Sequence, residues 1–185
     1  MHATKNGRRM LAMAISLYEL SVTNFLQTLG GVEGFLGRGL THFQEKKVDP
    51  NEVVEARLAP DMLPFKFQIH SVVHHSLGAI RGVQAGVFKP PAPVPAIDYA
   101  GLQKSVTEAR ETLQQVKPDE VNSLMGKDVV FEIGDRKLPF TAESFLQSFS
   151  LPNFYFHAAT AYDILRHKGV PLGKRDFLGR MRMKT

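Results

Sequence analysis

An asparagine and a histidine lie four residues apart near the end of the chain, in the stretch LPNFYFHAATAYDILRHKG of residues 151–169. On a helix that advances about 100° per residue, Asn153 and His157 share one face with Ala161 and Ile164. Because the rest of this face is mostly apolar, we expect both polar side chains to point into the core. Such a pair can be part of a metal site, or two core polar groups that hydrogen-bond to their neighbours.

The composition indicates a soluble globular protein. Of its 185 residues, 43% are hydrophobic and 22% are charged, which is enough for one core. Cysteine is absent, which excludes disulfides, thiolate zinc sites and cysteine nucleophiles and leaves nitrogen and oxygen as metal ligands. No apolar run reaches the ~18 residues that a membrane span needs, and the basic start is followed by only a short apolar stretch. We therefore expect a cytoplasmic protein without a membrane partner.

The net charge of +5 is concentrated at the two ends of the chain. Residues 1–9 carry +3 and residues 171–185 carry +4, so the body between them carries −2. A nucleic-acid site needs a fixed basic face, and no RNA-recognition, zinc-finger or helix-turn-helix motif is present. We expect no nucleic-acid partner, and flexible basic ends at about 1–9 and 180–185 whose removal leaves the melting temperature nearly unchanged.

Apolar residues at steps of three and four predict four long helices. They cover about 15–43, 63–82, 98–117 and 141–169, and a short helix at about 50–60 leads into the second. Each glycine in a helix costs up to ~1 kcal/mol against alanine, so a glycine-rich half of the first helix predicts a kink or the close approach of a neighbour. The five glycines concerned are Gly30, Gly31, Gly34, Gly37 and Gly39.

Two segments between the helices are not helical. The four prolines of VQAGVFKPPAPVPAID, residues 83–98, predict an extended crossover. The stretch VVFEIGDRKLPF, residues 129–140, alternates around a Gly-Asp turn and predicts a hairpin that pairs Glu132 with Lys137. The expected fold class is therefore all-α: a four-helix bundle, one domain over 1–185, with a long Pro-rich crossover and a small β-hairpin before the last helix.

Two stretches carry a family resemblance: RLAPDMLPFKFQIH at 57–70 and SLPNFYFHAATAYDILRHKGVPLGKRDFLG at 150–179. Together with the order of elements, they make the chain from about Ile15 to Gly179 similar to an uncharacterised family catalogued as domain of unknown function nineteen-ninety-three. That family more distantly resembles the DinB/YfiT-like metalloenzymes, which are four-helix bundles often found as dimers. The resemblance implies a DinB-like bundle, and some proteins of that larger group are thiol-dependent transferases.

The resemblance also implies a metal site. Those relatives bind a divalent metal through three histidines, one on the second long helix and two at H-x-x-x-H spacing on the last. Aligned on AYDILRHKGV, His157 matches the second of the paired histidines, and Asn153 stands where the first should be. An amide oxygen is a weak neutral donor that suits harder ions better than zinc or nickel. The implied ligands are His157, Asn153 and His74, with His70 as the reserve, and one divalent metal ion is the candidate cofactor.

Two functions remain open. In the first, the protein is a DinB-like metal-dependent enzyme with an altered metal site, comparable to the thiol-dependent transferases and supplied with its thiol from outside. In the second, the metal has been lost, and the bundle is a non-catalytic ligand-binding or dimeric interaction protein in which Asn153 and His157 are satisfied core groups. We expect a homodimer that takes a small-molecule ligand, with His75 and His167 at its surface.

Overall fold

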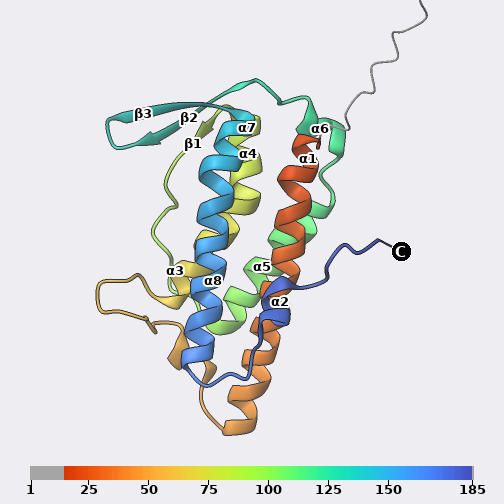
Figure 1. The fold of residues 1–185 in the computed structure, drawn as a ribbon. Coiled ribbons are helices and arrows are strands. Elements are labelled where there is room, and N and C mark those ends of the chain that lie inside the picture. The colour runs from red at the N-terminus through yellow and green to blue at the C-terminus, as the bar shows by residue number, and fades with distance from the viewer. Residues whose placement is uncertain (1–14, 185) are drawn as a thin grey trace, which may run out of the picture.

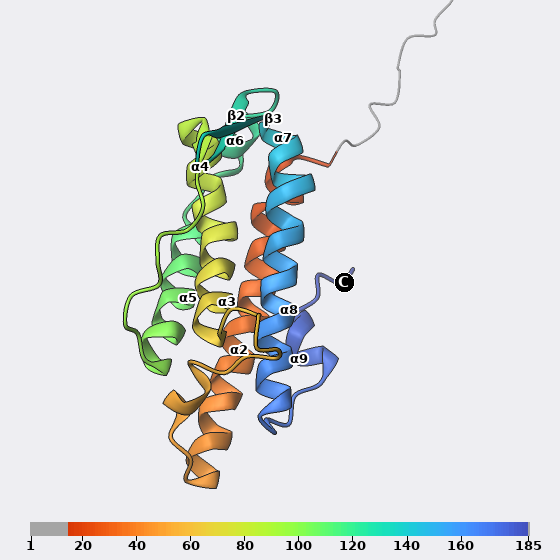
Figure 2. The same ribbon diagram turned by 90° about the vertical axis from the view of Figure 1, so that its left-hand side faces the viewer.

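Long helical rods lie side by side along most of the length of the protein, and a small sheet lies beyond one end of them (Figures 1 and 2). The computed structural model describes residues 15–184. Within them, one rod is formed by α1 and α2, a second by α3, η2 and α4, a third by α5, and a fourth by α7, η3 and α8. In chain order the elements are α1 (Leu17–Leu20), α2 (Val22–Lys46), the 3₁₀ turn η1 (Pro50–Val53), α3 (Phe65–Val73), the π-helical η2 (His74–Gly78), α4 (Ala79–Ala85), β1 (Val87–Phe88), α5 (Tyr99–Gln114), α6 (Pro118–Asn122), β2 (Asp128–Ile133), β3 (Arg136–Thr141), α7 (Ala142–Phe145), the π-helical η3 (Leu146–Ser150), α8 (Leu151–His167) and α9 (Lys174–Leu178).

Capping side chains fix where two of the rods begin. The carboxylate of Asp98 accepts a hydrogen bond from the backbone N–H of Gly101 (2.7 Å), and the hydroxyl of Thr141 accepts one from that of Ser144 (3.3 Å). Gly169, with φ of +88°, lies just past the end of α8 in the left-handed region that favours glycine. Local sequence signals therefore set these boundaries.

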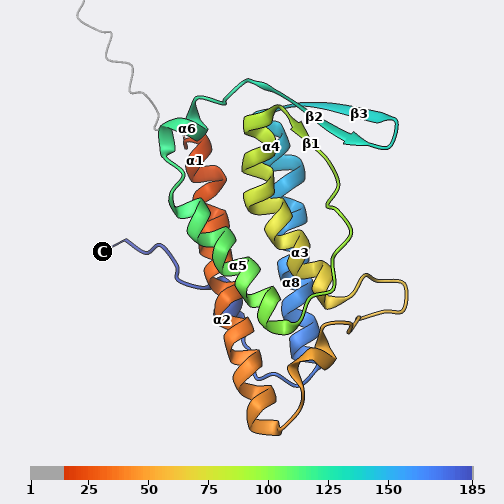
Figure 3. The ribbon, with the colours of Figure 1, turned by 180° about the vertical axis from the view of Figure 1, so that it is seen from behind.

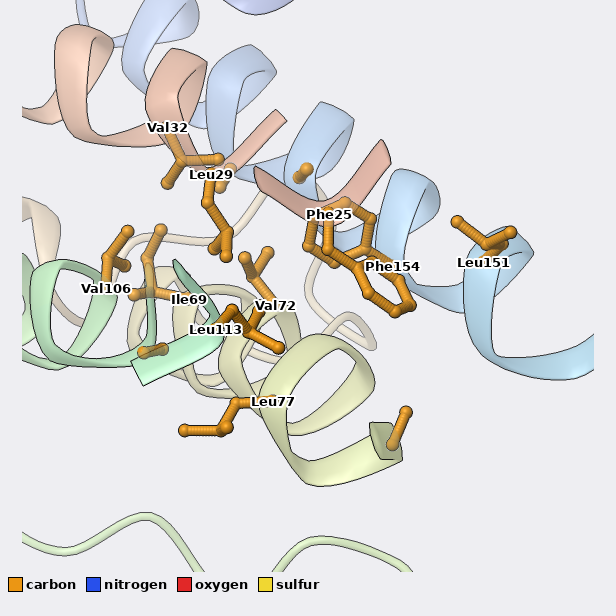
Figure 4. Packing of buried hydrophobic residues seen from close by; sticks show 14 of the residues in the cluster. Phe25, Leu29, Val32, Ile69, Val72, Leu77, Val106, Leu113, Leu151 and Phe154 are labelled. Atoms are coloured by element: carbon orange, nitrogen blue, oxygen red, sulfur yellow. The ribbon is translucent and has the colours of Figure 1, made fainter. Parts of the chain in front are cut away.

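The core is formed by the inward faces of the four rods (Figure 4). Its aromatic centre includes the edge-to-face pair of Phe25 on α2 and Phe154 on α8, whose ring centroids are 5.0 Å apart. Figure 4 also labels aliphatic core side chains from neighbouring rods, namely Leu29, Val32, Ile69, Val72, Leu77, Val106, Leu113 and Leu151.

The expectation of an all-α four-helix bundle is wrong. Besides the long rods, residues 15–184 contain the short helices α6 and α9 and a three-stranded mixed sheet in the order β1-β2-β3. The hairpin of β2 and β3 has the predicted register, with Glu132 opposite Lys137. The sequence did not predict β1, which lies at the start of the crossover. Its residues Val87 and Phe88 pair in parallel with Val130 and Phe131 of β2. Two residues are too short to show a strand period, so this pairing depends on tertiary contacts alone.

Two π-helical segments widen the rods that carry the candidate site. Pro152, the second residue of α8, lies just after η3. It has no N–H to donate to the carbonyl of Ser148, and its ring would crowd that carbonyl in a regular helix. The hydroxyl of Ser150 in η3 donates to the carbonyl of His75 in η2 (2.7 Å). The two irregular turns are thus directly bonded to each other, and such turns often occur at functional sites.

The glycines of α2 allow close approach by other segments at two positions. A Cβ at Gly31 would overlap the carbonyl oxygen of Phe177 in α9, and one at Gly39 would collide with the hydroxyl of Tyr99 on α5. The predicted close approach is confirmed there.

Residues 1–9 lie outside the part of the chain that the structure describes. In the C-terminal segment, Arg182 donates to Asn24 (2.8 Å) and Gln27 (3.2 Å) of α2, and the prediction that residues 180–185 are dispensable stays a prediction. Between residues 15 and 184, no helix is both long and apolar enough to cross a membrane.

Candidate functional site

His157 lies on α8 and faces α3. These two helices pack against each other (Figure 2). Nδ1 of His157 is 2.8 Å from Oε1 of Gln68, a residue of α3 that is only 2% exposed. The other end of the Gln68 amide donates from Nε2 to the carbonyl of Leu63 (2.8 Å), just before α3 begins. His157 is therefore held by a side chain that sequence reasoning did not single out.

Asn153 lies one turn before His157 on α8 and is half-buried. Its amide Nδ2 donates to the carbonyl of Phe149 in η3 (2.7 Å). Asn153 thus bonds back to its own rod at the π-helical turn, which leaves its amide oxygen as the group that can accept from another partner or bind a cation.

The histidine that approaches His157 is His75, and not the predicted His74. The rings of His75 and His157 are nearly parallel, with 14° between their planes and 5.8 Å between their centroids. His75 is 6% exposed, and its Nδ1 is buried without a hydrogen-bond partner among the described residues. The expectation that His75 lies at the surface is wrong, whereas His167 is exposed as predicted.

His74 and His70 face the crossover. Nε2 of His74 is 2.9 Å from the carbonyl oxygen of Lys89, and its ring lies 4.4 Å from that of Phe88 in β1. Burial lowers the pKa of His70, and a hydrogen bond to the backbone of Ala92 acts in the opposite direction. Both histidines therefore attach the crossover to the second rod, and the contacts of His74 do not direct it to His157.

The sequence contained a signal for His75 that is easy to miss. Gln68 and His75 are seven residues apart, two turns of a helix, and so share one side of the second rod. That side packs on α8, although its members are polar: Gln68, Ser71 and His75 are all buried. Leu63, an apolar residue on the opposite side of this rod, is 49% exposed.

Burial keeps the two facing imidazoles neutral. Desolvation lowers the pKa of His157 to about 4. The pKa of His75 falls to about 3, chiefly through desolvation and further through the neighbouring imidazoles of His74 and His157. At pH 7 the site therefore presents two uncharged rings, surrounded by the aromatic rings of Phe67, Phe88, Phe149 and Phe156.

The donors near His157 are two imidazoles and one amide, and not three histidines. Within residues 15–184, no group of three histidine, aspartate or glutamate side chains is placed to hold one ion. His157 and His75 offer neutral nitrogens, and the unpartnered buried nitrogen of His75 needs a partner. Asn153 can add one amide oxygen. Two imidazoles and an amide hold a divalent ion more weakly than three imidazoles.

Other hollows lie away from this pair. A cavity of about 620 Å³ lies where α2, η1 and the end of α8 meet, and His42, Lys46 and Lys168 are among the residues that line it. A cavity of about 340 Å³ borders the crossover side of the second rod and is lined in part by His74 and Lys89. Neither is lined by His75, Asn153 or His157.

Comparison with known proteins agrees with the geometry of the fold. Residues 17–178 match the model of a family described as "Domain of unknown function (DUF1993)". No curated protein matches the chain. Among solved structures, the crystal structure of a DinB family member protein from Shewanella denitrificans is 25% identical, with a TM-score of 0.76 over 91% of this chain and 95% of that one. The resemblance predicted from the two sequence stretches is thereby confirmed, and the fold is DinB-like.

Proposed function

Because the chain belongs to the family of unknown function DUF1993 and has a DinB-like fold, we propose that it binds one divalent metal ion at the contact between the second rod and α8. The proposed ligands are His157, His75 and the amide oxygen of Asn153. His75 takes the place that the sequence assigned to His74, because the ring of His74 is bonded to the crossover.

One observation carries this proposal: a buried imidazole nitrogen of His75 has no hydrogen-bond partner within residues 15–184, and its ring lies beside that of His157. An unpaired buried nitrogen costs free energy, whereas a bound ion would use its lone pair. Both imidazoles are neutral at pH 7, which is the state in which histidine binds metals. We expect modest affinity, because only two of the three donors are nitrogens.

The bound ion would supply Lewis acidity to a carbonyl, a water or an externally supplied thiol, since the chain has no cysteine. The chain's own residues would bind and orient it. Phe67 packs edge-on against His157 at 5.8 Å, and Phe149 against His75 at 5.7 Å.

A second candidate function is supported by the bonds that the site already makes. His157 is hydrogen-bonded to Gln68, and Asn153 is hydrogen-bonded to the carbonyl of Phe149. Both residues that α8 contributes to the site therefore already have protein partners. Under this alternative the cluster is a polar part of the core, and the protein is a non-catalytic binding or interaction protein. His157→Ala would then lower stability by roughly 1–3 kcal/mol without changing metal content.

Metal retention separates the two candidates. Protein loaded with excess nickel, zinc or manganese should keep near one equivalent after desalting, and His157→Ala should lose it. His167→Ala, on the same helix but exposed, is the matched control and should keep the metal. The metal proposal fails if wild type keeps none, or if His157→Ala keeps as much as His167→Ala.

We also propose that the protein forms a homodimer through the outer face of α8. On this helix the neighbouring aromatic side chains of Phe156 and Tyr155 are 59% and 39% exposed, and a partner subunit could cover both. Light scattering of wild type should give a mass twice that of the 20.6 kDa chain. Phe156→Glu should give the mass of a single chain. Met183→Glu, at a methionine that is 74% exposed, is the control. A wild-type protein that stays monomeric at high micromolar concentration would contradict this proposal.

A further inference from the structure

We infer that Gln68 is a positioning residue that holds His157 in the Nδ1–H tautomer, so that Nε2 carries the free lone pair. The inference deepens the proposed function and rests on it for the identity of what binds there. It concerns a residue of α3 that lies across the helix contact from His157.

The first step is the orientation of the Gln68 amide. Its Nε2 donates to the carbonyl oxygen of Leu63 at 2.8 Å. If the amide were turned over, its oxygen would face that carbonyl oxygen, and two acceptors would be in contact without a proton between them. The Leu63 carbonyl therefore directs Oε1 of Gln68 toward His157.

The second step is the position of the imidazole proton. Oε1 of Gln68 can only accept, and it lies 2.8 Å from Nδ1 of His157. Nδ1 must therefore carry the hydrogen and donate it. A neutral imidazole has one N–H, so Nε2 is left as the acceptor. The opposite tautomer would place the lone pair of Nδ1 against the oxygen of Gln68.

The third step is that water does not replace Gln68 easily. Gln68 is 2% exposed and lies in the contact between α3 and α8. Loss of its oxygen would leave Nδ1 of His157 without a partner, and the imidazole could then shift its hydrogen to Nε2. A partner on the second nitrogen is the usual way in which proteins orient a metal-binding histidine.

The inference can be tested on the metal-free protein by nitrogen NMR of ¹⁵N-labelled histidine at pH 7. Protonated and unprotonated ring nitrogens have well-separated shifts, so the tautomer of each histidine is read directly. We expect His157 to be in the Nδ1–H form in wild type and to lose that form in Gln68→Met, which keeps the length of the side chain. Exposed His167 should be unchanged throughout.

An Nε2–H form of His157 in wild type would overturn the inference, even if the variants fail to fold. It is also overturned if Gln68→Met keeps the Nδ1–H form. Nickel titration of the same proteins gives a separate answer: Gln68→Met should weaken binding by roughly 10–100-fold, the usual effect of losing such a partner. A wild-type protein in the Nδ1–H form that binds no metal refutes the proposed function and supports the role of Gln68.

Discussion

The two imidazoles between the second rod and α8 make the free energy of unfolding dependent on pH. In the native protein His157 and His75 have pKa values of about 4 and about 3, against 6.5 for an ordinary histidine. As the pH falls below about 6.5, the unfolded chain takes up protons on both residues while the native protein does not. Their contribution to stability is therefore fully present above the ordinary pKa and is lost as the pH falls toward 4.

We predict that the melting temperature of the metal-free protein falls between pH 6.5 and 4.5. His75→Phe, which keeps a ring but cannot be protonated, should show a shallower fall, and His167→Gln should match wild type. Carboxylates whose pKa is lowered in the native protein, such as Glu132, lose their contribution at lower pH and affect this window little. Thermal unfolding at a series of pH values measures the slope. Equal slopes for wild type and His75→Phe would show that His75 is not held neutral by the fold.

At the same scale, part of the site could be predicted from the sequence. The inward direction of His157 followed from helical spacing and is consistent with its bond to Gln68 on α3. The choice between His74 and His75 could not be made in the same way. It depends on which side of the second rod packs on α8, and that side is polar at Gln68, Ser71 and His75. Hydrophobic periodicity is misleading where a buried face is polar.

At the scale of elements, the C-terminal helix α9 is held against α2 by backbone contact. The carbonyl of Phe177 occupies the space of a side chain at Gly31, and Gln27 donates to the carbonyl of Leu178 (3.1 Å). Arg38 of α2 forms an ion pair with Asp176. From behind, the end of the chain leaves the body of the protein beside α2 (Figure 3).

We predict that Gly31→Ala and Gly34→Ala change stability in opposite directions. Both replace a glycine within α2 and gain up to about 1 kcal/mol of helix propensity. A methyl group at Gly34 meets no atom within 4 Å, so this variant should be more stable than wild type. At Gly31 it would displace α9, and overpacking of this kind costs about 1–3 kcal/mol. Chemical denaturation measures both, and equal stabilities would show that α9 does not dock at Gly31.

Most helices and strands could be predicted from signals in neighbouring residues. Elements that depend on contacts between distant residues could not. The hairpin was readable because its Gly-Asp turn and alternating strands lie within a few residues of each other. Its third strand, β1, was not, because Val87 and Phe88 pair with residues more than forty positions away. The π-helical segments η2 and η3 were not predicted either, because they too depend on contacts between distant residues. Pro152, which follows η3, was the one local signal for them.

At the scale of the whole molecule, the DinB-like arrangement places the second and fourth rods side by side and brings their polar residues together (Figure 1). The two specific stretches of sequence and the order of elements predicted the DinB-like resemblance, whereas the periodic segments gave neither the mixed sheet nor the short helices α6 and α9. These signals did not suffice for the site, because its members come from helices separated by about eighty residues, and the distances between side chains are set by packing.

The most direct test of the metal proposal compares two neighbouring histidines on the second rod. Isothermal titration of nickel into His75→Ala should show binding at least about tenfold weaker than in wild type, because a ligand has been removed. His74→Ala should bind within about twofold of wild type, because the ring of His74 is bonded to Lys89 and is not a proposed ligand. Weaker binding in His74→Ala with unchanged binding in His75→Ala, or no binding by wild type, would contradict a metal site between His75 and His157.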